Sequence, residues 1–135
     1  MNDIQMKQLM QLALDTREKA YAPYSHFLVG AALLGKDGRM FGGCNIENAS
    51  FGATQCAERT AYGKAVSEGC RQFEAIAICG GEEGAELRDQ CPPCGICRQF
   101  MAEFGDKDFQ VILFKDTEHY TVYSLDQVMP LIFNL

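Results

Sequence analysis

Three cysteines in two distant segments constrain the fold of this 135-residue chain more than any other feature. Cys56 opens the segment Cys-Ala-Glu-Arg, and Cys94 and Cys97 follow much later in Pro-Cys-Gly-Ile-Cys-Arg. Three thiolates can hold a zinc ion and leave its fourth tetrahedral position open for water. If all three bind one ion, the chain must fold so that these two segments meet.

Glu58, two residues after Cys56, indicates that the three cysteines form a catalytic metal site. A carboxylate that lies close to the metal without binding it can move the protons of the water. Residues two apart on a helix point about 200° away from each other. Cys56 and Glu58 can therefore address one metal only if Cys56 lies at the very start of a helix. The pattern predicts a hydrolytic active site at that helix end.

A closed structural zinc site with four protein ligands is the alternative. Cys91 precedes Cys94 by the spacing that separates Cys94 from Cys97, and His26 and His119 are further candidate ligands. A structural site usually has two similar Cys-x-x-Cys pairs, whereas the first segment here offers one cysteine and an acid. The spacing favours the catalytic site and leaves the structural one open.

Arg59 and Arg98, each directly after a cysteine motif, are candidate neighbours of the metal. Zinc with three thiolates carries a net negative charge, which works against acidifying a bound water. Both cysteine motifs fall at predicted helix starts, whose unpaired N–H groups carry partial positive charge. These groups and the two guanidinium groups are expected to take up part of the thiolate charge.

Composition and charge limit the classes of function. With 47% hydrophobic and 22% charged residues, residues 1–135 are expected to form one globular domain. The formal net charge of −6 argues against a nucleic-acid partner. The charged segment 1–21 argues against a signal peptide or a membrane span. A reducing cytoplasm is therefore expected, where clustered cysteines more often bind metal than form disulfides.

The hydrophobic pattern predicts helices that alternate with strands. Helices are expected over residues 4–21, 56–68 and 124–132, with another introduced by Pro92 and Pro93 that runs to Phe104. Strands are expected over residues 27–34, 40–44, 73–79, 111–114 and 121–123, with the first two in a hairpin and a loop over 80–90. This alternation indicates an α/β layer fold.

Four segments together resemble the cytidine deaminase family. Residues 56–61 (CAERTA) and 93–99 (PCGICRQ) look like the two zinc motifs of that family. Two earlier segments agree as well, YAPYSHF followed by VGAAL within residues 21–33, and GCNIENA at residues 43–49. They occur in the right order and cover almost the whole chain. The resemblance implies a three-layer α/β/α fold with a central mixed sheet of about five strands.

The resemblance also implies the reaction. Cys56, Cys94 and Cys97 would bind one zinc ion per chain, and Glu58 would be the proton shuttle. The reaction would be the hydrolytic deamination of free cytidine and deoxycytidine to uridine and deoxyuridine, a step of pyrimidine salvage. The alternatives are a deaminase of another nucleoside or of a nucleoside antibiotic, and a structural zinc-binding interaction module.

Four further residues are implied to bind the nucleoside. Asn45 and Glu47 would bind the ribose hydroxyls, a task that suits a donor–acceptor pair. Phe27 would pack against the pyrimidine ring, and backbone groups around Ala57 would read the base edge. Without the resemblance, Phe27 would be interpreted as core, and the two polar residues as part of a solvated loop.

The short, three-cysteine members of this family are homotetramers with shared active sites, and the length and Cys56 place this chain with them. Phe133 resembles the aromatic residue that a neighbouring subunit contributes over the pyrimidine. The alternative is that residues 131–135 are an ordinary docked terminus. Phe51, Ile96 and Cys91 depart from the common family pattern, which affects the expectation for fine specificity and not for the reaction.

Overall fold

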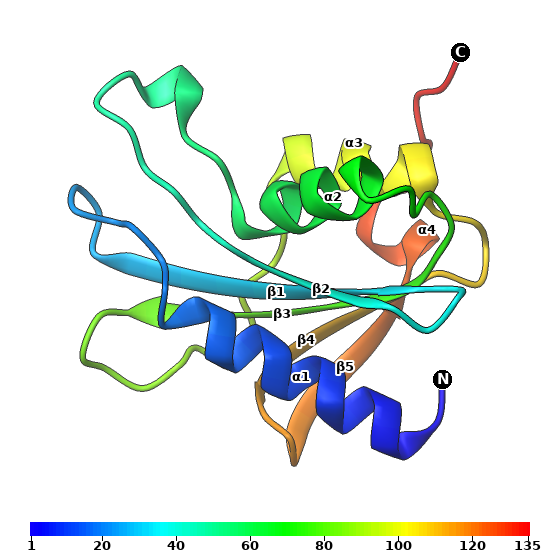
Figure 1. Ribbon diagram of the computed structural model, residues 1–135, viewed down its shortest axis with the longest axis horizontal. Helices are drawn as coiled ribbons and strands as arrows, with labels where there is room; N and C mark the ends of the chain where they lie inside the picture. The colour runs from blue at the N-terminus through cyan, green and yellow to red at the C-terminus, as the bar shows by residue number, and fades with distance from the viewer.

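A five-stranded mixed sheet with the strand order β2-β1-β3-β4-β5 forms the centre of the computed structural model, which describes residues 1–135 (Figure 1). The strands are β1 (Phe27–Gly35), β2 (Met40–Cys44), β3 (Phe73–Glu82), β4 (Gln110–Asp116) and β5 (His119–Ser124). Only β3 and β4 pair in parallel, and all other neighbours are antiparallel. The predicted hairpin of β1 and β2 is present.

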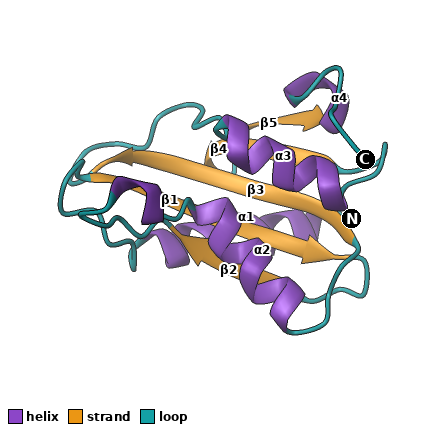
Figure 2. Cartoon of the chain, turned by 90° about the horizontal axis from the view of Figure 1, so that it is seen from above, coloured by secondary structure: helices purple, strands orange, loops and turns teal.

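Helices cover both faces of this sheet. They are α1 (Asp3–Arg17), α2 (Ala57–Ser67), α3 (Gly95–Phe104) and α4 (Leu125–Val128), with a short 3-10 helix η1 (Phe51–Ala53). Figures 1 and 2 show α1 on one face of the sheet and α2 and α3 on the other. The predicted three-layer α/β/α fold is therefore confirmed. None of these helices has the length and apolar character needed to cross a membrane.

The two faces of the central strands supply two separate cores. On β1, Ala31 and Leu33 pack into the core under α2 and α3, whereas Ala32 and Leu34 pack into the core under α1. Successive side chains of a strand point to opposite faces, so a strand buried on both sides is apolar at every position. This explains why β1 and residues 75–79 of β3 are continuous hydrophobic runs.

The predicted first helix, over residues 4–21, is too long. The helix ends at Arg17. After it, the N–H groups of Lys19 and Ala20 donate to the carbonyls of Thr16 and Arg17, three residues earlier, and so form turns and no further helix. Tyr21 then donates its N–H to the carbonyl of Asn45, 3.0 Å away. The chain leaves the helix because this pairing with a distant loop competes successfully with another helical turn.

Other predicted bounds are also wrong, and the strands expected over 111–114 and 121–123 are each three residues longer in the structure. The strand expected over 73–79 continues to Glu82, because the first residues of β1 pair with it as far as Phe27 opposite Glu82. The last helix, expected over 124–132, stops at Val128. Leu131 has a φ of 54°, in the left-handed region, and Pro130 has no N–H to continue the helix.

Gly43 of β2 sets how closely α2 approaches the sheet. A Cβ atom at this position would lie 2.3 Å from the carbonyl oxygen of Ala57 and 2.6 Å from the backbone nitrogen of Ala61. The first turn of α2 thus packs directly on the backbone of β2. This contact fixes the position of Cys56, the residue that precedes α2.

We expect Gly43→Ala to push α2 away from the sheet and to destabilise the protein by about 1–3 kcal/mol, the usual cost of overpacking. Urea denaturation would measure this. Gly63→Ala is the matched control, because Gly63 lies in α2 with open space around its Cβ position. That substitution should stabilise the protein by about 0.5–1 kcal/mol. Equal stability of the Gly43→Ala variant and the unchanged protein would contradict the close-packing argument.

Candidate active site

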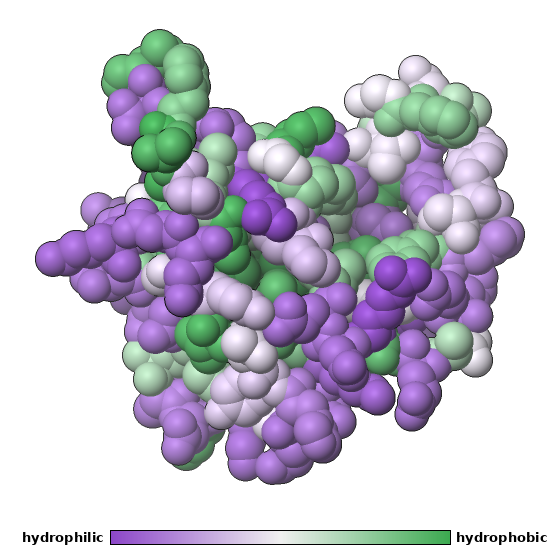
Figure 3. All heavy atoms as spheres, turned by 180° about the vertical axis from the view of Figure 1, so that it is seen from behind, coloured by the Kyte–Doolittle hydropathy of each residue, from purple (hydrophilic) through white to green (hydrophobic).

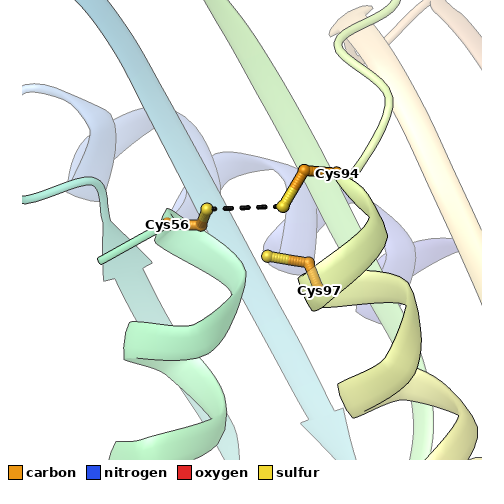
Figure 4. A group of neighbouring side chains, drawn as sticks. All are labelled: Cys56, Cys94 and Cys97. Carbon is orange, nitrogen blue, oxygen red and sulfur yellow. Dashed lines mark hydrogen bonds between the residues drawn. The ribbon is translucent and has the colours of Figure 1, made fainter. Parts of the chain in front are cut away.

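The two cysteine motifs occupy equivalent positions at the starts of two neighbouring helices. Cys56 is the N-cap of α2, and Cys94 is the N-cap of α3. Figure 4 shows the N-terminal ends of both helices side by side, with the three cysteine side chains directed toward one another. Glu58 falls in the first turn of α2, where the sequence argument requires it.

The three sulfur atoms have the spacing of a zinc site. They all lie within 4.8 Å of one another, and the Sγ atoms of Cys56 and Cys94 are 3.7 Å apart. Thiolates on a tetrahedral zinc ion, with Zn–S distances of about 2.3 Å, would be roughly 3.8 Å apart. Cys97 is buried, Cys56 is half-buried and Cys94 is exposed, so the site opens to solvent on one side. The residues fit a zinc ion with an open position.

The thiols already influence one another strongly. Hydrogen bonds from the Cys97 thiol, and then from Arg59 and Cys94, outweigh burial and lower the pKa of Cys56 to about 5. The hydrogen bond to Cys56, together with burial, raises the pKa of Cys97. One sulfur thus holds negative charge while its neighbour keeps the proton. A divalent cation would remove this conflict, because metal binding displaces the remaining protons.

Glu58 contributes a carboxyl group next to the cysteines and does not belong to the group of three candidate metal ligands. Its side chain is buried, with 4% of the residue exposed. Burial, assisted by the negative charge of Cys56, raises the pKa of Glu58 to about 7. A carboxyl group with a pKa near neutrality can both accept and release a proton at physiological pH.

The two arginines that follow the motifs have different partners. Arg59 donates to the carbonyl of Thr54 at 2.9 Å and lies 3.9 Å from the sulfur of Cys56, while its buried Nε has no partner. Arg98 donates to the carbonyls of Pro93 and Val128 at 2.7 and 2.5 Å. The sulfur contact predicted for both is therefore made by Arg59, whereas Arg98 joins the start of α3 to the end of α4.

Asn45 and Glu47, the predicted ribose ligands, hold the loop around β1. The Asn45 side chain accepts from the N–H of Val29 at 2.9 Å and donates to the carbonyl of Phe27 at 2.8 Å. Glu47 accepts from the N–H groups of Tyr24 and Ser25 at 3.0 and 3.1 Å and from the Ser25 hydroxyl. These hydrogen bonds hold the pKa of Glu47 below its ordinary value, and the bond from the Ser25 hydroxyl has the largest effect.

Phe27 lies in a small cluster with Cys91 and Arg88. The Arg88 guanidinium lies over the Phe27 ring, 4.9 Å from its centre. A Cβ at Gly80 would lie 2.6 Å from the Cys91 sulfur and 3.2 Å from the Phe27 ring. Cys91 is thus beside Phe27 and outside the group of three sulfurs, which argues against the closed four-cysteine site.

The remaining candidates lie elsewhere. His26 is 3.4 Å from Glu83, and His119 is bound to Asp116 at 2.9 Å, so both histidines have carboxylate partners away from the sulfurs. Ala57 is fully buried in the first turn of α2. Phe133 is exposed, and its carbonyl accepts from the Gln99 side chain at 3.0 Å.

Comparison with known proteins decides the family. The sequence model of the cytidine and deoxycytidylate deaminase zinc-binding region matches residues 3–113, which include all three cysteines and Glu58. The chain belongs to this family. The zinc-binding deaminase inferred from the four motifs is thereby confirmed.

Individual deaminases are similar over most of their length. The cytidine deaminase of Sporosarcina psychrophila is 46% identical over 123 residues, which cover 89% of this chain and 87% of the relative. That of Halalkalibacterium halodurans is 54% identical over 105 residues, which cover 78% and 76%. The crystal structure of the Burkholderia pseudomallei cytidine deaminase matches with a TM-score of 0.82 at 45% identity, covering 93% of this chain and 97% of the other.

Sequence reasoning missed two residues that the deaminase fold brings to this region. Arg88 lies in the segment interpreted as a loop, and no local signal connects it with Phe27. Tyr62, whose buried hydroxyl has no partner, lies on α2 one helical turn after Glu58. The spacing of four residues between Glu58 and Tyr62 on a predicted helix could have indicated that they share a face.

We expect Arg59→Gln to weaken zinc binding by about tenfold, the usual cost of losing a group that supports a metal ligand. Competition with a chromogenic chelator would measure this affinity. Arg71→Gln is the control, since Arg71 is exposed and lies in the loop after α2. Unchanged zinc affinity together with an unchanged pH–rate profile would show that Arg59 does not tune the site.

Proposed function

We propose that this chain catalyses the hydrolytic deamination of cytidine and deoxycytidine to uridine and deoxyuridine, with release of ammonia. The observation that carries the proposal is the combination of three converging cysteines, open on one side, with a buried carboxyl group that is not a ligand. The similar proteins from Sporosarcina psychrophila and Halalkalibacterium halodurans are named cytidine deaminases.

Glu58 moves the protons of the reaction. Cys56, Cys94 and Cys97 would hold a zinc ion, which would supply Lewis acidity at the open side of the sulfurs. Glu58 takes a proton from the water that attacks C4 of the cytosine ring. It gives this proton to ring N3, and then takes a second proton from the hydroxyl now on C4 and passes it to the amino group. The C4–N bond breaks as the C4 carbonyl forms, so that one water is consumed and one ammonia is released. The raised pKa of Glu58, about 7, suits a group that must act as base and acid in turn.

The groups around β1 orient the nucleoside. An amide side chain has two N–H groups and a carbonyl oxygen with two lone pairs. The two hydrogen bonds of Asn45 to β1 leave one N–H and one lone pair for a ribose hydroxyl. The Glu47 carboxylate has spare lone pairs for a second hydroxyl, Phe27 contacts the pyrimidine, and the backbone at Ala57 reads the base edge.

The substrate is an unphosphorylated nucleoside. Arg88 lies over Phe27 but forms an ion pair with Glu82, so its charge is already neutralised. A substrate phosphate would need an unpaired cation in this region. A deaminase of another nucleoside is the second candidate, because the metal and Glu58 would serve any amino-substituted ring.

The proposed assembly is a homotetramer with shared active sites. The proposed location of the enzyme is the cytoplasm, and its proposed role is in pyrimidine salvage. Figures 1 and 3 show that η1 and the C-terminal segment project from the body and carry hydrophobic residues. Phe51 of η1 is 77% exposed and Phe133 is 67% exposed. Exposed apolar projections of this kind are typical of surfaces that are covered by another subunit. Phe133 would then cover the pyrimidine in a neighbouring site.

We expect Glu58→Gln to lower turnover of cytidine by a factor on the order of 10²–10⁴ while the zinc content per chain stays unchanged. The ultraviolet absorbance of cytidine, deoxycytidine, cytosine, CMP and adenosine would be followed with each protein. Glu68→Gln is the control, because Glu68 is the exposed C-cap of α2. Substantial turnover by the Glu58→Gln variant would remove Glu58 from the mechanism. Turnover of adenosine alone would favour the second candidate, and turnover of CMP alone would contradict an unphosphorylated substrate.

We expect deletion of residues 133–135 to raise KM for cytidine at least about tenfold, because the aromatic cover of a neighbouring site is lost. Steady-state kinetics would measure this, and light scattering would report the mass of both proteins. Leu135→Ala is the control, since it changes the same segment and keeps Phe133. Unchanged kinetics in a folded, truncated protein would mean that the terminus contributes nothing to the site.

A further inference from the structure

The Ser25 hydroxyl joins two residues that the proposed function places around the nucleoside. It donates a hydrogen bond to Oε2 of Glu47, which is proposed to bind a ribose hydroxyl. It also accepts a hydrogen bond from the N–H of Phe27, 3.0 Å away, and Phe27 is proposed to contact the pyrimidine. An ionised carboxylate has no proton to donate and a backbone N–H cannot accept one, so both hydrogen bonds have a fixed direction.

The segment 24–25 occupies one oxygen of the Glu47 carboxylate. Oε1 accepts from the N–H groups of Tyr24 and Ser25, at 3.0 and 3.1 Å, whereas Oε2 accepts only from the Ser25 hydroxyl. A carboxylate oxygen has two lone pairs, so the free capacity for a substrate hydroxyl lies on Oε2. Ser25 therefore bonds the same oxygen that a ribose hydroxyl would reach. The Ser25 hydroxyl also contributes most to the lowered pKa of Glu47, which favours the charged acceptor.

Backbone pairing on both sides holds Glu47 beside the cysteine site. The N–H of Glu47 donates to the carbonyl of Tyr21 at 2.8 Å. Its neighbour Ile46 exchanges two backbone hydrogen bonds of 2.9 Å with Gln55, the residue before Cys56. These contacts fix the backbone near the metal site, but they leave the carboxylate free to rotate. The orientation of the carboxylate is therefore set by its own three hydrogen bonds.

The backbone at His26 brings Ser25 and Phe27 together. His26 has a φ of 58°, in the left-handed region, which histidine adopts more readily than most residues other than glycine. Its N–H donates to the carbonyl of Ala22 at 3.0 Å, and its carbonyl accepts from the N–H of Glu83 at 2.8 Å. A residue keeps such a conformation only where its surroundings hold it. The Ser25 hydroxyl is thus anchored at the start of β1 and can act as a fixed support for Glu47.

The carboxylate that Ser25 supports is open to a ligand. Ser25 and Glu47 both line a hollow of about 280 Å³. A site that hydrogen-bonds a substrate hydroxyl rejects an analogue that lacks it. The precision of that rejection depends on where the carboxylate oxygen is held.

We propose that Ser25 is a positioning residue, whose hydroxyl orients the Glu47 carboxylate and thereby sets the preference of the enzyme for a sugar that carries a hydroxyl group. The proposal rests on the proposed function, because it requires that Glu47 bind such a hydroxyl. The alternative is that the Ser25 hydroxyl only fastens the turn before β1. In that case its removal would affect all substrates alike.

Ser25→Ala removes the hydroxyl, and two nucleosides report the effect. Deoxycytidine carries a 3′-hydroxyl, whereas 2′,3′-dideoxycytidine has no hydroxyl at either position. We expect kcat/KM for deoxycytidine to fall about tenfold, mainly through a higher KM, because a hydrogen bond that orients a charged group is lost. The value for dideoxycytidine should change by less than about twofold, since this substrate never uses Glu47.

Three further variants separate positioning from folding. Ser25→Thr keeps a hydroxyl and should keep the native ratio of the two kcat/KM values. Ser67→Ala is the matched control, because Ser67 is exposed at the end of α2 and its hydroxyl donates only to the carbonyl of Gly63. In a protein that already carries Glu47→Ala, the change Ser25→Ala should have no further effect on deoxycytidine, because residues that act together are not additive.

Equal losses for both nucleosides would overturn the proposal, and so would unchanged kinetics of the Ser25→Ala variant. A comparable further loss in the Glu47→Ala background would also overturn it, because the hydroxyl would then act through Phe27 or the fold. A native protein that deaminates both nucleosides equally well would remove the ribose role of Glu47 and this proposal with it. Failure of the native protein to deaminate deoxycytidine and cytidine would instead refute the proposed function.

Discussion

The alignment of two helix starts on one face of the sheet is the constraint on which the site depends. Cys56 and Cys94 cap α2 and α3, and their sulfurs are 3.7 Å apart only because both helices begin at the same level. The sheet fixes α2 through the backbone contact at Gly43. The aromatic contacts of Tyr62 with Phe100 and Phe104 hold α3 against α2. The hydrophobic core thereby forces together groups that would otherwise repel one another as thiolates.

The three sulfurs differ in how deeply they are buried, and each has different neighbours. Cys94 is exposed to solvent, which leaves the site open on that side, whereas Cys97 is fully enclosed. Arg59 lies beside Cys56, with its guanidinium 3.9 Å from the sulfur. Glu58 is buried close to Cys56, and burial keeps its pKa near neutrality. Low polarity around the carboxyl group thus produces the acid–base behaviour that hydrolysis needs.

Local patterns predicted the site better than they predicted the bounds of the elements. Helix geometry alone requires Cys56 at a helix start if Cys56 and Glu58 are to face one metal, and the structure has Cys56 at the N-cap. The end of α1 and the extension of β3 depend on pairing with distant segments, at Asn45 and Phe27. No local window of sequence contains that information. The same holds for Arg98, whose partner Val128 lies thirty residues away.

The predicted ribose ligands show why residue type alone does not separate structural from functional tasks. Asn45 and Glu47 both hold the backbone around β1, and each keeps hydrogen-bonding capacity for a substrate. Their roles in binding stay predictions, whereas their structural contacts are visible. An amide or carboxylate with several lone pairs can serve both purposes at once.

The central claim is that three cysteines bind the zinc and that its fourth position is open. X-ray absorption spectroscopy of the zinc-loaded protein tests this most directly, because it counts the sulfur and lighter atoms around the metal. We expect three sulfur neighbours at about 2.3 Å and one oxygen or nitrogen neighbour at about 2.0 Å. Four sulfur neighbours would contradict it, since a closed site has no place for the water that the reaction consumes.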